Sequence, residues 1–241
     1  MAASQSESES PSRVLAVLGM HRSGTSWLAG SLEEKGLFLG EVSREDPFNR
    51  RGNREHPALM EIHEGVLRDN GGSWKRPAWP NRWSEERRAA LAEFIASNAG
   101  HPFWGFKDPR ALLCLDEWHR QVPGLLRVGI FRHPLAVHRS LAARNPRFKE
   151  ARSLELWRAY NERLAEEHAR DPFPVLRFDL APEALAGGLD EVARGLGLPA
   201  ADRSCAFFDE ALVHQGEAGG GPVPRRCRDL WATLEGLAAR T

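Results

Sequence analysis

Residues 19–26 (GMHRSGTS) restrict the fold of this chain more than any other segment. They follow an apolar run at 14–18 that predicts a buried β-strand, and they lead into a helical pattern over residues 25–35. Gly19 and Gly24 permit a tight turn, after which successive backbone N–H groups point into one concavity at the helix N-terminus. A strand, a glycine-bearing turn and a helix in this order predict a phosphate-binding loop.

Strand and helix patterns alternate along the rest of the chain. Further strands are predicted at 103–106, 126–131 and 174–178, and helices at 55–69, 134–144 and 153–169. This alternation predicts one α/β domain over residues 13–241, a P-loop-like three-layer fold with a central parallel sheet flanked by helices. Ligands of such folds bind beyond the carboxyl ends of the strands, so the loops after residues 18, 106 and 131 are the expected site.

Charge and cysteine content exclude several classes of function. Thirty-three Lys and Arg balance 33 Asp and Glu, so no net field draws the chain to nucleic acid or to an anionic membrane. No apolar run approaches the ~20 residues of a membrane span. Residues 1–12 are predicted to be a disordered polar tail, and the three well-separated cysteines predict reduced thiols in the cytoplasm. No His/Cys cluster has the spacing of a metal site.

The loop departs from the nucleoside-triphosphatase pattern G-x-x-x-x-G-K-[ST] at its most informative position. Thr25 stands where that pattern has lysine, and the cation of this loop is Arg22. Triphosphatases also need a magnesium-binding Asp at the end of another strand, whereas here strand 126–131 is followed by Arg132. A metal-free site that binds an anion through arginines therefore fits better than a P-loop small-molecule kinase, which stays the alternative.

Arg132 and Ser140 form a second candidate anion site. Arg132 follows a predicted strand, and Ser140 lies eight residues later, about two turns along the next helix. A guanidinium fork suits a phosphate group. Two such segments, each directly after a strand, are more specific together than either is alone.

Together the two segments resemble the sulfotransferases that use 3′-phosphoadenosine 5′-phosphosulfate (PAPS). Residues 19–27 resemble the 5′-phosphosulfate loop of bacterial members and of the tyrosylprotein sulfotransferases, and Arg132 with Ser140 resembles the 3′-phosphate motif. The likeness spans roughly residues 14–199. It implies a sulfotransferase that needs no metal and whose donor-binding residues are His21, Arg22, Ser23, Gly24, Thr25, Ser26, Trp27, Arg132 and Ser140.

Sulfuryl transfer needs cations for the leaving phosphate and a base for the acceptor proton. Arg22 is the first candidate cation. Lys107 is the second, since it ends the strand 103–106 in a Lys-Asp-Pro run that resembles the tyrosylprotein enzymes. Asp108 and Arg110 are expected to form a local ion pair that shapes this loop.

The general base stays open between several residues. Glu55 closes the run 49–55 (NRRGNRE), which resembles an Asn-x-x-Gly-x-x-Glu segment of bacterial members. Glu41 lies close to where the tyrosylprotein enzymes keep a catalytic Glu. His56 and His21 are further candidates. The histidine of the phenol and steroid enzymes does not carry over, because Pro109 occupies its neighbourhood.

The acceptor is the least determined part of the expected reaction. It is a small molecule or conjugate that carries a hydroxyl or an amine. Trp74, Trp79 and Trp83 either wall an acceptor cleft or pack beneath a long loop. Trp157 and Tyr160 are expected in the core.

Two questions stay open on the sequence alone. Residues 216–222 form a glycine-rich segment that is either a lid over the nucleotide or a linker to the last helix. A nucleotide-binding module without activity is a third hypothesis for the whole chain, and the oligomeric state is undetermined.

Overall fold

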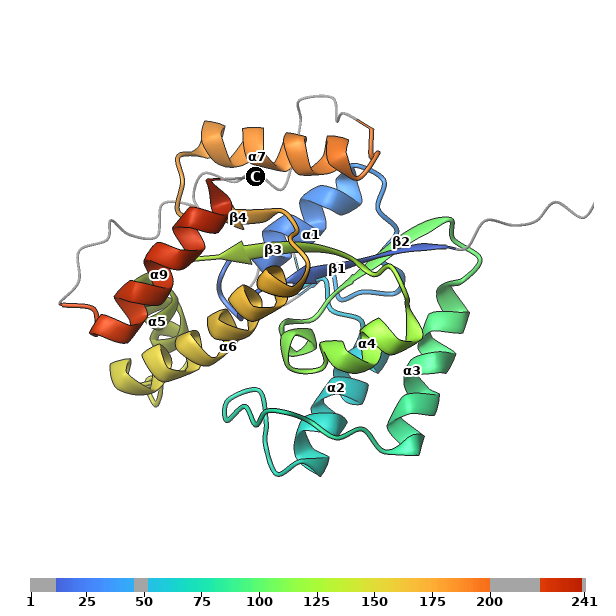
Figure 1. Cartoon of the computed structure of the whole chain (residues 1–241), viewed down its shortest axis with the longest axis horizontal. Helices are drawn as coiled ribbons and strands as arrows, with labels where there is room; N and C mark the ends of the chain where they lie inside the picture. The colour runs from blue at the N-terminus through green and yellow to red at the C-terminus, as the bar shows by residue number, and fades with distance from the viewer. Residues whose placement is uncertain (1–11, 46–51, 200–221, 240–241) are drawn as a thin grey trace, which may run out of the picture.

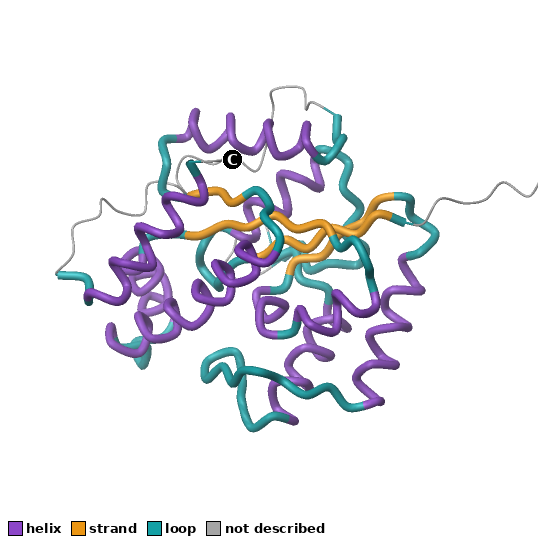
Figure 2. Tube along the Cα trace, in the orientation of Figure 1, coloured by secondary structure: helices purple, strands orange, loops and turns teal. Residues whose placement is uncertain are grey.

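A four-stranded parallel sheet forms the centre of the molecule (Figure 1). The computed structural model describes residues 12–45, 52–199 and 222–239. The predicted tail and the glycine-rich segment 216–222 lie outside these residues, except for Ser12 and Pro222. The strand order is β2-β1-β3-β4. Figure 2 shows the strands, in orange, between helices on either side. The strands are β1 (Arg13–Leu18), β2 (Phe103–Lys107), β3 (Leu126–Phe131) and β4 (Val175–Arg177).

Helices cover both faces of the sheet, which confirms the predicted three-layer α/β architecture (Figure 1). One layer consists of α1 (Thr25–Glu34) and α7 (Pro182–Gly195). The other contains α2 (Pro57–Asp69), α3 (Glu85–Asn98), η1 (Pro109–Leu113), α4 (Leu115–Gln121), α5 (Pro134–Arg144), α6 (Glu150–Arg170) and α9 (Arg225–Ala238). No helix within the described ranges combines the length and apolar character that a bilayer crossing requires.

The apolar run of β1 is buried on both faces because successive side chains point to opposite layers. Val14 and Leu18 pack with the α2–α6 layer, whereas Leu15 and Val17 pack with α1 and α7. This burial explains why the strand lacks the apolar–polar alternation of a half-exposed sheet.

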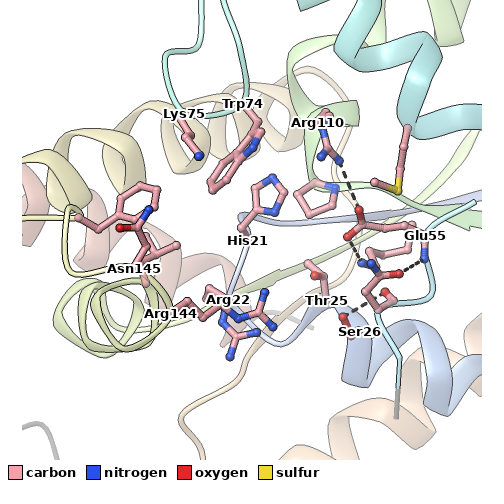
Figure 3. A pocket seen from close by; sticks show the side chains of 16 residues that line it. His21, Arg22, Thr25, Ser26, Glu55, Trp74, Lys75, Arg110, Arg144 and Asn145 are labelled. Atoms are coloured by element: carbon pink, nitrogen blue, oxygen red, sulfur yellow. Dashed lines mark hydrogen bonds and ion pairs between the residues drawn. The ribbon is translucent and has the colours of Figure 1, made fainter. Parts of the chain in front are cut away.

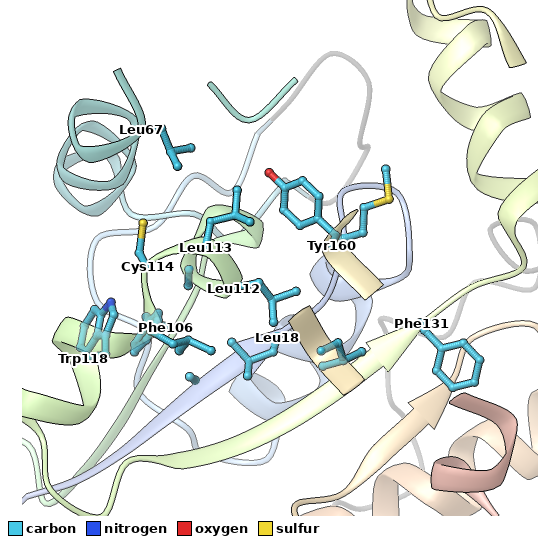
Figure 4. Close-up of a cluster of buried hydrophobic side chains, with 14 of the residues drawn as sticks. Leu18, Leu67, Phe106, Leu112, Leu113, Cys114, Trp118, Phe131 and Tyr160 are labelled. Atoms are coloured by element: carbon cyan, nitrogen blue, oxygen red, sulfur yellow. The ribbon is translucent and has the colours of Figure 1, made fainter. Parts of the chain in front are cut away.

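The larger core cluster is rich in aromatic rings (Figure 4). Phe106 and Trp118 are stacked, with centroids 3.9 Å apart. Trp157 and Tyr160 are fully buried, which confirms their expected place in the core. The indole N–H of Trp157 donates to the carbonyl of Arg132 at 2.9 Å, so the core also fixes the chain at the end of β3.

The parallel register brings three loops to one edge of the sheet. Val17 of β1 lies opposite both Lys107 and Val128. Because parallel strands end on the same side, the loops after β1, β2 and β3 meet there. The fold therefore brings together, at one edge of the sheet, the three loops where the sequence predicts the site.

Helix α2 begins two residues later than the sequence pattern predicts. The Nδ1 atom of His56 accepts the N–H of Ala58 at 3.2 Å as a cap, and Pro57 fits the first helical position. Glu55 therefore lies in an extended segment before the helix. Its carbonyl accepts the N–H of Ser43 at 3.0 Å.

Candidate active site

The loop between β1 and α1 has a specific backbone shape. Arg22 adopts a left-handed conformation (φ 70°), which is uncommon for a residue other than glycine. Gly24 is also left-handed (φ 93°), and a Cβ atom there would lie 2.3 Å from the ring of Phe178. The first N–H groups of α1 have no carbonyl partner inside the helix. They can therefore bind an anion at the carboxyl edge of the sheet.

Arg22 connects the two predicted anion-binding segments. Its Nε atom donates to the Oγ atom of Ser140 on α5 at 2.7 Å, across 118 positions of sequence. Arg132 is buried at the end of β3, where its Nε donates to Oδ1 of Asp179 at 3.3 Å. Burial lowers the pKa of Arg132, and the Asp179 carboxylate opposes this effect. The fold thus brings the arginines and the serine to one end of the sheet.

A cavity of about 310 Å³ opens beside this loop (Figure 3). Six of the predicted site residues line it: His21, Arg22, Thr25, Ser26, Glu55 and Lys107. The other six do not line it: Ser23, Gly24, Trp27, Glu41, Arg132 and Ser140. Trp27 is buried and packs against Phe178 with ring centroids 6.0 Å apart. Its contact is therefore with the core and not with the cavity.

Glu55 lies between two cations in the cavity wall. Lys107 donates from Nζ to Oε1 of Glu55 at 2.6 Å, and Arg110 donates from Nη1 to Oε2 at 3.3 Å. All three residues are at least nine-tenths buried. Burial lowers the pKa of Lys107, and the Glu55 carboxylate opposes this effect. A buried carboxylate with two donors is held in one orientation.

A second layer of buried groups holds Arg110. Oδ1 of Asp108 accepts from Nη1 of Arg110 at 2.7 Å and from its backbone N–H at 3.0 Å. Oδ2 of Asp108 lies 2.8 Å from Nδ1 of His63, whose Nε2 accepts the indole N–H of Trp118 at 2.9 Å. An indole N–H can only donate, so Nε2 of His63 carries no proton. The ring proton is therefore on Nδ1, which donates to Asp108. The expected Asp108–Arg110 pair is present, and it extends to Glu55.

Burial alone would raise the pKa of Asp108. The charge of Arg110 and the hydrogen bond from His63 outweigh burial, so this pKa lies well below its ordinary value. Asp108 therefore stays ionised and keeps Arg110 in place.

The backbone before Glu55 is tied to the phosphate-loop helix. The Oγ of Ser26 donates to the carbonyl of Asn53 at 3.1 Å, and the N–H of Glu55 donates to Oδ1 of Asn53 at 2.9 Å. Gly52 is left-handed (φ 74°), and a Cβ atom there would lie 2.3 Å from the backbone of Arg44. The start of the predicted run, residues 49–51, lies outside the described residues. An Asn two residues before the Glu is the sequence signal for this turn.

The rival bases occupy different places. Glu41 is exposed and does not line the cavity, and His56 serves as the cap of α2. His21 lines the cavity, and its Nε2 has no hydrogen-bond partner among the described residues. Burial, followed by the charge of Arg110, lowers the pKa of His21 well below 6.5, so its imidazole is neutral at pH 7.

The three tryptophans of the long loop lie in three different environments. Trp74 lines the cavity, and Trp83 is buried in the core. Trp79 is 37% exposed, with the guanidinium of Arg163 lying 3.6 Å from the centroid of its ring. The core packing is thus confirmed for Trp83, Trp74 stays a candidate wall of the acceptor cleft, and Trp79 fits neither alternative.

Several cavity residues were not predicted from the sequence: Lys75, Arg110, Arg144, Asn145 and Phe148. Arg144 follows Ser140 by four positions on α5, and this one-turn spacing is a signal that could have found it. Lys75 has no such signal, because a long loop carries it to the cavity. No group of three or more His, Cys, Asp or Glu side chains in the described part of the chain has the arrangement of a metal site.

No protein-family model and no curated protein sequence matches this chain. Among solved structures, it resembles the sulfotransferase domain of the olefin synthase from Synechococcus PCC 7002. The TM-score is 0.52 at 17% identity, over 97% of this chain and 96% of that one. Sulfotransferases STF1 from Mycobacterium tuberculosis H37Rv (TM-score 0.49, 15% identity, 95% of this chain and 78% of that one) and STF9 from Mycobacterium avium (0.48, 13%, 95% and 76%) also align. The first likeness establishes the fold: this chain has the α/β fold of a bacterial sulfotransferase domain.

Proposed function

We propose that this chain is a PAPS-dependent sulfotransferase of the family that its sequence motifs resemble. It would transfer a sulfuryl group to a hydroxyl or amine and release adenosine 3′,5′-bisphosphate (PAP). One observation carries the proposal: a single cavity is lined by Arg22 of the anion-binding loop and by the buried Glu55–Lys107 pair. The shared sulfotransferase fold supports it.

The residues at the carboxyl edge suit the donor's anionic groups. The N-terminus of α1 and Arg22 supply N–H donors and positive charge for the phosphosulfate. Ser140 and the two Nη groups of Arg132 are assigned to the 3′-phosphate, while the Nε of Arg132 stays bonded to Asp179. No acidic side chain belongs to the loop itself, which favours an anion over a cation.

The chemical step needs a base and charge stabilisation. In the donor, an oxygen joins the sulfur atom to the phosphate, and this S–O bond breaks when the phosphate leaves. Of the two hydrogen bonds to the Glu55 carboxylate, the one to Oε2 is the longer. We therefore assign to Oε2 the role of accepting the proton of the acceptor hydroxyl. The acceptor oxygen can then attack sulfur in line with the departing phosphate. Lys107 and Arg22 stabilise the negative charge that develops there.

Glu55 is preferred over the other cavity candidate, His21. Two donors hold the Glu55 carboxylate in the cavity wall, whereas Nε2 of His21 has no hydrogen-bond partner among the described residues that would orient it. His21 also lies against Trp74, with ring centroids 4.4 Å apart, which suits a wall of the acceptor site.

The donor assignment can be tested by calorimetry without knowledge of the acceptor. We expect PAP to bind in the presence of EDTA, and we expect Arg22→Ala to weaken it at least about tenfold through loss of a charge-assisted contact. Arg68→Ala is the matched control, since Arg68 is an exposed arginine paired with Glu61 away from the cavity. ATP with magnesium binding more tightly than PAP would support the kinase alternative and contradict the proposal.

A further inference from the structure

We propose that the acceptor carries an anionic group, such as a carboxylate, on a flat apolar body, and that Lys75 recognises this group. The inference rests on the proposed function and deepens it. Figure 3 shows Glu55 and Arg110 at one end of the cavity and Lys75, Trp74 and Asn145 toward the other. The Glu55 end is the site of the chemistry, and the Lys75 end faces the part of the acceptor remote from the reacting oxygen.

Flat rings form the walls at the Lys75 end. The rings of Trp74 and Phe148 are near-parallel, with an interplanar angle of 28° and centroids 5.8 Å apart. His21 continues the wall toward the Glu55 end through its contact with Trp74. Aromatic walls favour a planar or unsaturated ligand, because rings stack on one another.

Lys75 supplies positive charge at these rings. Its Nζ lies 5.2 Å from the centroid of Trp74 and 5.9 Å from that of Phe148. It is exposed, and no carboxylate of the described residues pairs with it, whereas Lys107 at the other end is bonded to Glu55. An ammonium group that lines a cavity without a carboxylate partner among the described residues can bind an anionic group of a ligand.

The neighbouring polar groups are also donors. Oδ1 of Asn145 accepts the backbone N–H of Arg147 at 3.0 Å, which fixes the orientation of the amide and leaves its N–H₂ group as a donor for a ligand. Arg144, the preceding residue, adds a guanidinium to the lining. Glu55 is the one carboxylate among the described lining residues, and it lies at the opposite end. The chemistry of the Lys75 end therefore selects an anion.

The volume limits the size of the acceptor. A cavity of about 310 Å³ is near the lower limit of small-molecule sites. The acceptor class is therefore a compact hydroxyl or amine compound with an aromatic or otherwise planar body and a carboxylate at the far end, or a conjugate that ends in such a group.

Three matched probes test this inference on the PAP complex by calorimetry. They are 3-(4-hydroxyphenyl)propanoate, its neutral primary amide, and the cationic analogue tyramine. We expect the carboxylate to bind about fivefold to tenfold more tightly than the amide, with tyramine weakest, because one ammonium–carboxylate contact distinguishes them. Added NaCl should reduce this preference, since the contact is partly exposed.

Two lysine variants test whether Lys75 causes the tighter binding of the carboxylate. Lys75→Met should bring the carboxylate and the amide to within about twofold of each other, since the contact that separates them is gone. Lys149→Met should keep the preference, because Lys149 is exposed and does not line the cavity.

The inference is overturned if the carboxylate fails to bind the PAP complex, binds no better than the amide, or keeps its advantage in Lys75→Met. PAP binding is measured first. Failure of PAP itself to bind removes the proposed function and this inference together. PAP binding without a carboxylate preference removes this inference alone.

Discussion

The two ends of the cavity differ in how their charges are held. At the Glu55 end, Lys107, Arg110 and Asp108 are buried and joined by hydrogen bonds of 2.6–3.3 Å. At the other end the ammonium of Lys75 is exposed, lies beside the rings of Trp74 and Phe148, and has no carboxylate partner among the described residues. Buried, mutually compensated charges keep one geometry, because any member that loses its partner is strongly destabilised. Under the proposed function, this contrast corresponds to a preorganised end for the reaction and an adaptable end for acceptor recognition.

The largest expected effect is on stability at the buried end. Asp108→Asn leaves Arg110 buried without its main counter-charge, so the free energy of unfolding should fall by about 3–5 kcal/mol. Urea denaturation followed by circular dichroism measures this change. The matched control is Asp116→Asn, whose exposed pair with Arg170 should be worth less than about 1 kcal/mol. Equal losses in the two variants would remove the distinction between buried and exposed charge.

The pH dependence of stability should follow the same carboxylate. Because the folded-state pKa of Asp108 is depressed below 3.8, its contribution is complete above that pH and is lost as the pH falls toward the folded-state value. The urea midpoint of the wild type should therefore fall below about pH 4 more steeply than that of Asp108→Asn. Parallel curves would mean that Asp108 is not held ionised by its partners.

A large kinetic effect should separate the two candidate carboxylates. Glu55→Gln keeps the shape of the side chain but removes the base, so kcat should fall about 100- to 1,000-fold. Glu41→Gln should change kcat by less than about twofold, because Glu41 is exposed and outside the cavity. Release of PAP from PAPS measures both. The reverse order of effects would make Glu41 the base.

A moderate effect is expected where the two anion-binding segments meet. Ser140→Ala removes one hydroxyl bonded to Arg22, so PAP affinity should fall about threefold to tenfold. Calorimetry measures the affinity, and Ser97→Ala, a helical serine away from the cavity, is the control. An unchanged PAP affinity in Ser140→Ala would take Ser140 out of the donor site.

The smallest stability effect should come from the exposed end of the cavity. Lys75→Met removes a charge with no described carboxylate partner, so the free energy of unfolding should change by less than about 0.5 kcal/mol. The same urea titration measures it. A loss as large as that of Asp108→Asn would mean that the two ends are held alike.

The sequence carries most of the information about the fold, because its strands are mainly apolar and glycine or proline stands in the loops that follow β1, β2 and β3. The strand starting at Leu126 has the predicted bounds, and the first helix ends within one residue of them. The predicted start of α2 was two residues too early, because the apolar spacing of Leu59, Ile62 and Val66 does not mark where the helix begins. The cap at His56 and the proline after it set that start. Local signals thus set the type of element, and caps set its limits.

The site was less predictable, because its contacts join distant positions. Glu55 and Lys107 are 52 residues apart, and His63 reaches Asp108 across 45. Their pairing depends on the sheet register and on the path of the loop before α2, neither of which is a local pattern. Lys75 belongs to the same class, since only the folded loop brings it to Trp74 and Phe148.

Transfer of radiolabelled sulfate from PAPS measures the proposed sulfotransferase activity itself. The protein is incubated in EDTA with a pool of hydroxyl and amine compounds that includes 3-(4-hydroxyphenyl)propanoate. We expect the wild type to label an organic acceptor, and we expect Lys107→Met to bind PAP but to transfer sulfate at least about 100-fold more slowly. No labelled acceptor from a wild-type protein that binds PAP, or undiminished transfer by Lys107→Met, would contradict the proposed function.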